Sequence, residues 1–276
     1  MVSKDQRRRQ LAREKFERQQ QRRSATQRKT KRRNVIIAST LAVVLAAGVA
    51  AYASAGLAGD DGKADRAASD PSPTTPPDPC EQPAKGAPSQ RTWKKEPAMS
   101  IDTAASYTAK LGTTCGGIEL KLDAAEAPHT VNSFAFLAGK HFFDHSRCHR
   151  LVDQQIYVLQ CGDPTGTGGG SPGYTLPDEN LKDPRLKGDV YPAGTVAMAN
   201  NYDGKHDNTR NSGGSQFFLV YQDSPLPPNY TPFGTVTGGM DVLKKIAAAG
   251  TRPDPKIGST APNATVVIDK AAVTKS

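Results

Sequence analysis

Two segments of the chain carry polar side chains that could act on a substrate. The first reads CHRLVDQQIYVLQCGDPTGTGGGSPGY and holds Arg150 and Gln160. The residues between them predict a hairpin with its turn at Asp153–Gln155, which would place Arg150 and Gln160 side by side on antiparallel strands. Arginine does not release its proton in proteins, so this pair suits hydrogen bonding to an uncharged polar substrate better than proton transfer. The structural alternative is a rim arginine paired with an acid, Asp153 or Asp163.

The second segment, GTVAMANNYDGKHDNTRNSGGSQFFLVY, ends with two adjacent phenylalanines on a predicted strand. Successive side chains of a strand point to opposite faces. Of Phe217 and Phe218, one is therefore expected in the core and the other on the opposite face, near Gln216. A phenylalanine beside an amide would form an apolar pocket with a hydrogen-bonding edge.

Three motifs resemble known site patterns but lack a required part. The glycine loop GTGGG has neither the Lys-Ser/Thr of a P-loop nor a following helix, as a nucleotide site requires. Gly169–Gly173 fits the G-x-S-x-G pattern of serine hydrolases, but Pro172 has no backbone N–H to donate to an oxyanion hole. The run HFFDHSRCHR matches no common zinc-ligand spacing. We therefore expect no metal and no cofactor, and interpret His149 as a buried structural histidine that makes one hydrogen bond.

Hydrophobic patterning predicts a mainly β domain. One helix begins at Pro128 and stops at Gly139, and a second, MDVLKKIAAAG, ends at Gly250. Short strand-like runs lie at Tyr107–Leu111, Ile118–Leu122, Leu151–Val152, Ile156–Leu159, Thr195–Ala199, Phe217–Tyr221, Phe233–Val236 and Thr265–Ile268. Seven or eight short strands with two separate helices favour a closed antiparallel barrel plugged at its ends, with an open sandwich as the alternative.

Composition divides the 276 residues into four segments. Residues 1–33 hold 14 Lys and Arg against three acids, so the net charge of +9 belongs to a basic tail, and we expect no nucleic-acid partner for the folded part. Residues 34–59 include an uncharged run long enough to cross a bilayer and predict a transmembrane helix. Residues 60–99 predict a Pro-rich disordered linker, and residues 100–276 a single folded domain.

The basic tail before the apolar run predicts a single-pass protein of the cell membrane, with a cytoplasmic N-terminus and an extracytoplasmic domain. A cleavable signal peptide is the alternative, because Ala51-Tyr52-Ala53 resembles a cleavage site. Either way the domain is exported, which permits disulfides. Cys148 and Cys161 could bridge two strands, and Cys80 and Cys115 would form the remaining pair, with buried free thiols as the alternative.

The motifs HR…Q-C-GDPTGTGGGSPGY, DEN, GTVAMAN, GGSQFFLVY and FGTV, in this order over about residues 100–272, resemble the cyclophilins, a family of peptidyl-prolyl cis-trans isomerases. The basic anchor resembles the membrane-anchored extracytoplasmic branch of actinobacteria. The resemblance implies an eight-stranded barrel with two helices, in which Arg150 is catalytic, Gln160 orients it and Phe218 forms the base of a proline pocket. It also implies substrate-binding residues at Tyr157, Val158, Ala199, Asn200, Gln216, Leu226 and Tyr230.

Several positions depart from the family pattern. The turn between Arg150 and Gln160 and the loop of residues 201–212 are longer than usual, and Tyr230 replaces a frequent histidine. Pro225 stands where many relatives carry a tryptophan important for cyclosporin, which puts cyclosporin binding in doubt. We expect an isomerase that acts on Pro-containing segments of exported polypeptides. The alternative is a non-catalytic module that binds such segments as a chaperone or scaffold at the cell surface.

Overall fold

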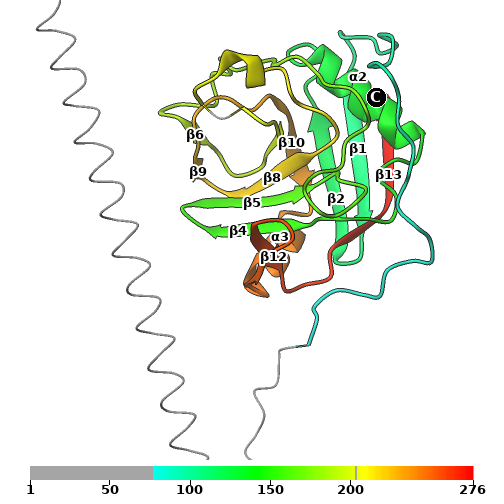
Figure 1. The fold of residues 1–276 in the computed structure, drawn as a ribbon, viewed down its shortest axis with the longest axis vertical. Coiled ribbons are helices and arrows are strands. Elements are labelled where there is room, and N and C mark those ends of the chain that lie inside the picture. Colours follow the sequence, from blue (N-terminus) through cyan, green and yellow to red (C-terminus); the bar gives the residue numbers. More distant parts are fainter. Residues whose placement is uncertain (1–76, 203, 276) are drawn as a thin grey trace, which may run out of the picture. The chain divides into compact units, whose positions relative to one another are not determined.

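A computed structural model of the protein describes residues 77–275 except residue 203. These residues form a mainly β domain with two α-helices, as the sequence pattern predicted (Figure 1). The elements in chain order are β1 (Tyr107–Thr113), β2 (Gly116–Leu122), α2 (Pro128–Gly139), β3 (Ser146–Arg147), β4 (Arg150–Gln154), β5 (Ile156–Cys161), β6 (Val190–Tyr191), β7 (Thr195–Met198), the 3₁₀ helix η1 (Asp207–Thr209), β8 (Phe217–Gln222), β9 (Ser224–Pro225), β10 (Pro232–Gly238), α3 (Met240–Ala248), β11 (Thr251–Asp254), β12 (Ser259–Pro262) and β13 (Val267–Lys275).

Nine strands form one curled antiparallel sheet in the order β3-β13-β1-β2-β10-β7-β8-β5-β4. Two short two-stranded sheets, β11-β12 and β6-β9, lie outside it. The strand pairing differs from the predicted closed eight-stranded barrel. The sheet has nine strands, and among the described residues its edge strands β3 and β4 do not pair with each other. The very short strands β3, β6 and β9 were missed because two residues carry no readable alternation.

The main core lies between one face of the large sheet and the helices α2 and α3. Ala109 and Leu111 of β1 are buried while Lys110 between them is exposed, which is the alternation of a strand with one face in the core. Phe134 of α2 packs edge-on against Phe217 of β8, with ring centroids 5.4 Å apart. One face of the sheet thus packs in the main core, and side chains on the opposite face can form a binding site.

The first turn of α2 is capped by a distant side chain. Ala127, the residue before the helix, makes no side-chain cap. Instead the carboxylate of Glu179 accepts hydrogen bonds from the backbone N–H groups of His129 and Thr130 and from the Thr130 hydroxyl, at 2.7–3.0 Å. A carboxylate at a helix N-terminus satisfies free N–H groups and complements the helix dipole. The contact fastens the long segment between β5 and β6 to the core.

Residues 77–100, named the N-terminal strap, pack along the domain. The ring of Trp93 meets the rings of Phe136 and Phe142 with centroids 5.2 and 5.9 Å apart. Near the start of the strap, Cys80 forms a disulfide with Cys115 in the turn between β1 and β2. The structure therefore corrects the predicted linker of residues 60–99: residues 77–99 belong to the folded domain.

Backbone contacts hold the strap at several further points. The amide of Ala84 donates to the Asp269 carboxylate, and the amide of Trp93 donates to the carbonyl of Pro172 in the glycine-rich segment. The side-chain amide of Asn132 on α2 donates to the carbonyls of Pro97 and Ala98. Composition predicted disorder because the segment is rich in proline and polar residues. Two single residues, Cys80 and Trp93, attach it to the domain, and an average over the segment does not reveal them.

Trp93→Ala should lower the free energy of unfolding by about 2–3 kcal/mol, because a half-buried aromatic side chain loses its packing against two phenylalanines. Urea denaturation at constant pH measures the change. Lys94→Ala, at an exposed neighbouring position, is the control and should stay within about 0.5 kcal/mol of the unchanged protein. Equal stability of both variants would mean that the strap does not contribute to the fold.

The predicted basic tail (1–33), transmembrane helix (34–59) and first part of the linker (60–76) lie outside the described residues. Among the residues that are described, no helix combines the length and apolar character needed to cross a membrane.

Candidate functional site

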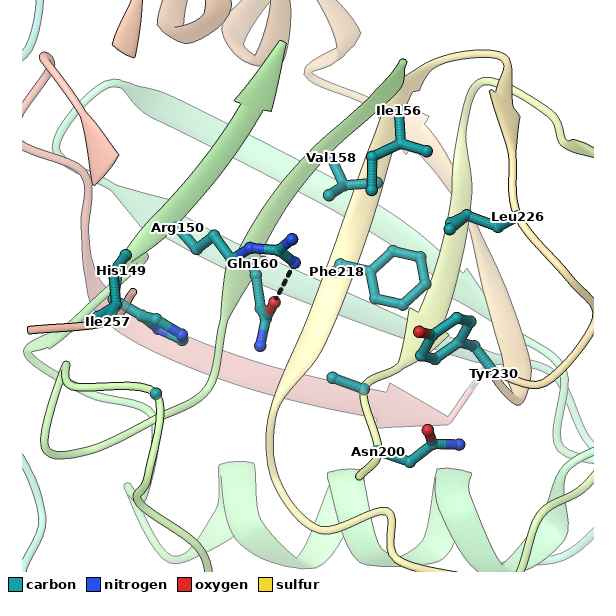
Figure 2. Close-up of a pocket in the computed structure, with 12 residues that line it drawn as sticks. His149, Arg150, Ile156, Val158, Gln160, Asn200, Phe218, Leu226, Tyr230 and Ile257 are labelled. Carbon is teal, nitrogen blue, oxygen red and sulfur yellow. Dashed lines mark hydrogen bonds between the residues drawn. The ribbon is translucent and has the colours of Figure 1, made fainter. Parts of the chain in front are cut away.

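Arg150 and Gln160 lie opposite each other on β4 and β5, in the register that the hairpin prediction required. The Nη1 atom of Arg150 donates a hydrogen bond of 3.1 Å to Oε1 of Gln160. The turn between the strands is at Gln155, whose φ of 66° places it in the left-handed region. The two side chains project from the same face of the sheet, away from the main core (Figure 2).

The chain of amides continues from Gln160 to Gln216. Nε2 of Gln160 donates to Oε1 of Gln216 at 2.9 Å. Nε2 of Gln216 in turn donates to the carbonyls of Gly168 and Gly170, both at 2.9 Å. The glycine loop therefore fixes Gln216, Gln216 fixes Gln160, and Gln160 fixes one nitrogen of Arg150.

The glycine loop itself is held by a buried carboxylate. Asp163 is fully buried and accepts hydrogen bonds from the amides of Thr165, Thr167 and Gly168, at 2.6–3.1 Å. The Thr165 hydroxyl also donates to this carboxylate, at 2.8 Å. Burial on its own would raise the pKa of Asp163, but the hydrogen bonds, led by that from the Thr165 hydroxyl, leave the pKa below its usual value. A Cβ at Gly170 would collide with the Asp163 carboxylate, so the loop needs glycine there.

Arg150 is half-buried, and within the described part of the chain no carboxylate pairs with it. The predicted alternative partners are used elsewhere: Asp153 accepts from the Thr251 hydroxyl, and Asp163 holds the glycine loop. Burial lowers the pKa of the Arg150 guanidinium, an effect that Tyr230 opposes. Arginine nevertheless stays protonated at neutral pH. The site thus contains a cation whose remaining N–H groups are not neutralised by an acid.

The guanidinium stands at the wall of a cavity of about 290 Å³ (Figure 2). Phe218 of β8 lies in this cavity on the sheet face opposite to Phe217, as alternation predicted. The ring of Phe218 meets Tyr230 edge-on with centroids 5.4 Å apart. The residues that line the cavity are His149, Arg150, Ile156, Val158, Gln160, Gly168, Ala199, Asn200, Phe218, Leu226, Tyr230 and Ile257.

Eight of the ten residues assigned to the site from the sequence are among those lining residues, and two are not. Gln216 lines an adjoining cavity of about 170 Å³. The Tyr157 ring packs instead against Tyr221, with centroids 5.9 Å apart. Because side chains on β5 alternate, Gln160 and Val158 share their face with Ile156, so Ile156 takes the place that the resemblance assigned to Tyr157.

Residues around the cavity floor are fixed by contacts that the sequence did not indicate. Tyr191 is fully buried, donates its hydroxyl to the carbonyl of Tyr230 at 2.7 Å and accepts from the amide of Tyr230. Asn200 donates from Nδ2 to the carbonyl of Asn229 at 2.8 Å. The amide of Ala199 donates to the Gln216 carbonyl at 2.9 Å. These contacts join the loops after β7 and β9 into one wall.

The disulfide Cys148–Cys161 lies immediately beside the site. Cys148 is two residues before Arg150, and Cys161 directly follows Gln160. The bridge therefore closes the open end of the β4–β5 hairpin, opposite its turn. Together with Cys80–Cys115 it forms the pairing considered from the sequence, and the structure holds no free cysteine among its described residues.

His149 was assigned a structural role with one hydrogen bond, but its environment differs. It is 6% exposed, lines the cavity, and its Nδ1 atom has no hydrogen-bond partner among the described residues. Burial lowers the pKa of His149; Asp163 opposes this effect and the Arg150 cation adds to it. The imidazole is therefore neutral at physiological pH and adds no second positive charge to the site.

The depressed pKa of His149 predicts how stability depends on pH. The unfolded chain binds a proton at this residue near pH 6.5, whereas the folded protein resists protonation until the pH is lower. The contribution of neutral His149 to the free energy of unfolding is thus fully present above about pH 6.5 and is lost as the pH falls through the folded-state pKa. His149→Gln should flatten the loss of unfolding free energy between pH 7.5 and pH 5, measured by urea denaturation. An unchanged slope in the variant would contradict this assignment.

The chain is similar to one family of known proteins and to curated relatives from mycobacteria. The family model described as "Cyclophilin type peptidyl-prolyl cis-trans isomerase/CLD" matches residues 108–273. A protein of Mycobacterium leprae named "Probable peptidyl-prolyl cis-trans isomerase B" is 44% identical over 181 residues, which are 62% of this chain and 59% of the relative. A Mycobacterium tuberculosis (strain H37Rv) protein of the same name is 43% identical over 171 residues, 59% of this chain and 53% of the relative.

A solved structure is also similar. The crystal structure of a Cryptosporidium parvum cyclophilin-type peptidyl-prolyl cis-trans isomerase aligns with 62% of this chain and 99% of its own, with a TM-score of 0.50 and 25% sequence identity. The similarity to the mycobacterial relatives spans less than two thirds of their length. The region that the family model matches runs from β1 to β13 and includes the strands and loops that line the cavity.

Proposed function

The chain belongs to the cyclophilin-type peptidyl-prolyl cis-trans isomerase family, and from the geometry of its site we propose that it accelerates cis–trans isomerisation of X–Pro peptide bonds. The observation that carries the proposal is the half-buried guanidinium of Arg150, which pairs with no carboxylate among the described residues. It stands at the wall of a cavity whose lining includes the apolar side chains of Phe218, Val158 and Leu226. A positive donor beside an apolar slot fits a substrate that is a proline ring joined to an amide.

The reaction needs no bond to be made or broken. The barrier to rotation, about 18–20 kcal/mol, exists because the nitrogen lone pair is delocalised into the carbonyl. The two isomers of an X–Pro bond differ by only about 0.5–1 kcal/mol, yet exchange takes tens to hundreds of seconds. An enzyme therefore has to stabilise the twisted amide and nothing else. A site without an acid–base pair or nucleophile is sufficient for this task.

Arg150 supplies that stabilisation in the proposed mechanism. As the amide twists, the lone pair localises on the prolyl nitrogen, which becomes a better hydrogen-bond acceptor. A guanidinium N–H directed at this nitrogen binds the twisted state more strongly than the planar one, and only such a difference lowers the barrier. Phe218, Leu226 and Val158 would hold the proline ring in the cavity while the bond on its N-terminal side rotates.

The neighbouring groups are proposed to hold the substrate backbone. Ala199 and Asn200 line both the cavity of Phe218 and the adjoining one, so an extended peptide that runs from one cavity to the other would pass them. Gln216 uses both of its Nε2 hydrogens on the glycine loop. We therefore propose that Gln216 acts mainly by fixing Gln160, whose Nε2 atom donates to the Oε1 atom of Gln216.

We further propose that the domain works outside the cytoplasm, on exported polypeptides. The uncharged run of residues 35–59 behind a basic tail supports export, and so do the disulfides Cys80–Cys115 and Cys148–Cys161, because disulfides persist in oxidising compartments. Slow X–Pro isomerisation limits the folding of many proteins, so an isomerase is useful where exported chains fold.

Exchange spectroscopy on an Ala-Pro peptide tests the activity. The cis and trans resonances of the peptide should exchange measurably faster when the purified protein is present at substoichiometric concentration. If resonances of the peptide shift and broaden on binding but exchange is not accelerated, the cavity is a recognition site and the enzyme assignment is wrong. A peptide with Ala-Ala in place of Ala-Pro is the control, and it should not bind in either case.

A further inference from the structure

The hairpin formed by β11 and β12 lies against the edge strand β4, which carries Arg150. The hydroxyl of Thr260 on β12 donates to the Leu151 carbonyl at 2.6 Å. The hydroxyl of Thr251 on β11 donates to the Asp153 carboxylate at 3.1 Å. β4 is the last strand in the order of the large sheet, so this hairpin covers an edge that has no ladder partner there.

A third contact of the hairpin goes to the guanidinium. Nε of Arg150 donates a hydrogen bond of 3.0 Å to the hydroxyl of Ser259, a residue 109 positions away in the sequence. Gln160 receives the bond from Nη1 on the other side. Two nitrogens of Arg150, Nε and Nη1, therefore donate hydrogen bonds to side chains from two different sheets.

Two anchors determine the orientation of a guanidinium, whereas one does not. A planar group bound through one nitrogen can still swing about that contact, and a second contact at another nitrogen fixes its plane. Arginine has five N–H donors. The bonds to Ser259 and Gln160 engage two of them, and the remaining donors on Nη1 and Nη2 are turned toward the cavity (Figure 2). The hydroxyl of Ser259 thus decides where the unengaged N–H groups point.

The same hairpin also forms part of the cavity wall. Ile257, in the turn between β11 and β12, lines the cavity beside His149 and Arg150 (Figure 2). Docking of the hairpin does not depend on Ser259, because Thr251 and Thr260 tie it to β4 at separate points. The Ser259 hydroxyl is therefore not needed to hold the hairpin on β4, and its hydrogen bond goes to the side chain of Arg150.

We propose that Ser259, at the start of β12, is a positioning residue of the isomerase site. Ser259 fixes the plane of the Arg150 guanidinium and directs its unengaged N–H groups toward the prolyl nitrogen. The inference rests on the proposed isomerase activity for its functional part. Its geometric part, the anchoring of Nε, can be measured without any activity.

The functional test is Ser259→Ala. It should lower kcat for Ala-Pro isomerisation about tenfold and leave KM nearly unchanged, because a misdirected guanidinium still leaves the proline cavity intact. Ser259→Thr, which keeps a hydroxyl, should recover most of the rate. Thr251→Val removes a hydroxyl contact between the same hairpin and the same strand, and should lower stability without lowering kcat. Equal loss of kcat in Ser259→Ala and Thr251→Val would assign the effect to general loosening and overturn the proposal.

A double-mutant cycle isolates the contact. Lysine has no Nε–H group and cannot make the hydrogen bond that Arg150 donates to Ser259. Ser259→Ala should therefore have no further effect on kcat in an Arg150→Lys background. Additive losses would contradict a role exerted through Arg150.

The geometric test is the ¹⁵Nε–¹Hε resonance of Arg150, assigned by comparison with Arg150→Lys. In the unchanged protein the resonance should be sharp and protected from solvent exchange, and in Ser259→Ala it should broaden or vanish at neutral pH. An unaltered resonance in Ser259→Ala would refute the anchoring. If the protein shows no isomerase activity yet the resonance responds as expected, the proposed function fails while the placement of Arg150 by Ser259 stands.

Discussion

Arg150→Ala should reduce kcat/KM for Ala-Pro isomerisation by roughly 100- to 1000-fold, which is the range found when one donor that stabilises a developing charge is removed. The guanidinium is the charged donor at the cavity, and Gln160 and Ser259 hold it there. Without it the cavity keeps its apolar surface but provides no partner for the prolyl nitrogen. Binding of the peptide should weaken far less than turnover, so that KM or the peptide Kd changes only a few-fold.

Stability provides the control for this variant. Arg150 has no carboxylate partner among the described residues, so removing it leaves no buried acid uncompensated. The unfolding free energy of Arg150→Ala should therefore stay within about 1 kcal/mol of the original value. Arg150→Lys keeps the charge but lacks the planar fork of donors, and it should recover little activity. A fully active Arg150→Ala protein would exclude the proposed mechanism.

Phe218→Ala should lower kcat/KM by about tenfold to a hundredfold. Burial of an apolar ring contributes about 1.5–3 kcal/mol, and each 1.4 kcal/mol corresponds to a factor of ten. Phe218 lies in the cavity with Tyr230 and Tyr191 as ring neighbours, at 5.4 and 6.2 Å between centroids. Its loss should appear as weaker peptide binding as well as slower turnover, because it removes a surface that both the planar and the twisted amide use.

The adjacent phenylalanine gives the matched comparison. Phe217 is fully buried in the main core, with ring centroids of Phe134 and Phe143 at 5.4 and 5.8 Å. Phe217→Leu should therefore cost about 1–2 kcal/mol of unfolding free energy while activity stays within twofold. Urea denaturation and peptide exchange, measured on both variants, separate the two faces of β8. The reverse outcome, with activity lost at Phe217 and retained at Phe218, would show that the cavity is not the site.

The placement of Arg150 beside Gln160 was predictable because both lie in one hairpin, and the register of a hairpin follows from its turn. The opposite faces of Phe217 and Phe218 followed from alternation in the same way. Tyr157, which the resemblance assigned to the site, packs against Tyr221 in the structure. Alternation from Gln160 puts Ile156 on the cavity face.

Contacts between segments far apart in the chain left no trace in the local pattern. Ser259 and Ile257 reach the site from a hairpin more than a hundred residues after Arg150, and no periodicity in that hairpin signals a partner. The strap was missed because a composition rich in proline and polar residues predicts disorder. Its long-range anchors, the disulfide of Cys80, the ring contacts of Trp93 and the backbone hydrogen bonds, are not visible in composition. In each case the missing information is a long-range contact.

The position of β13 has a consequence for the order in which this domain can assemble. β13 comes last in sequence among the described strands but lies between β3 and β1, and it pairs residues as distant as Thr108 and Thr274. A chain that emerges from its N-terminal end presents β1 with one side unpaired until residues 267–275 arrive. Pairings over such separations are slow to form, and an unpaired strand edge is a template for aggregation. During its own biogenesis this protein therefore passes through a stage with an open edge at β1, which closes only when β13 pairs with it.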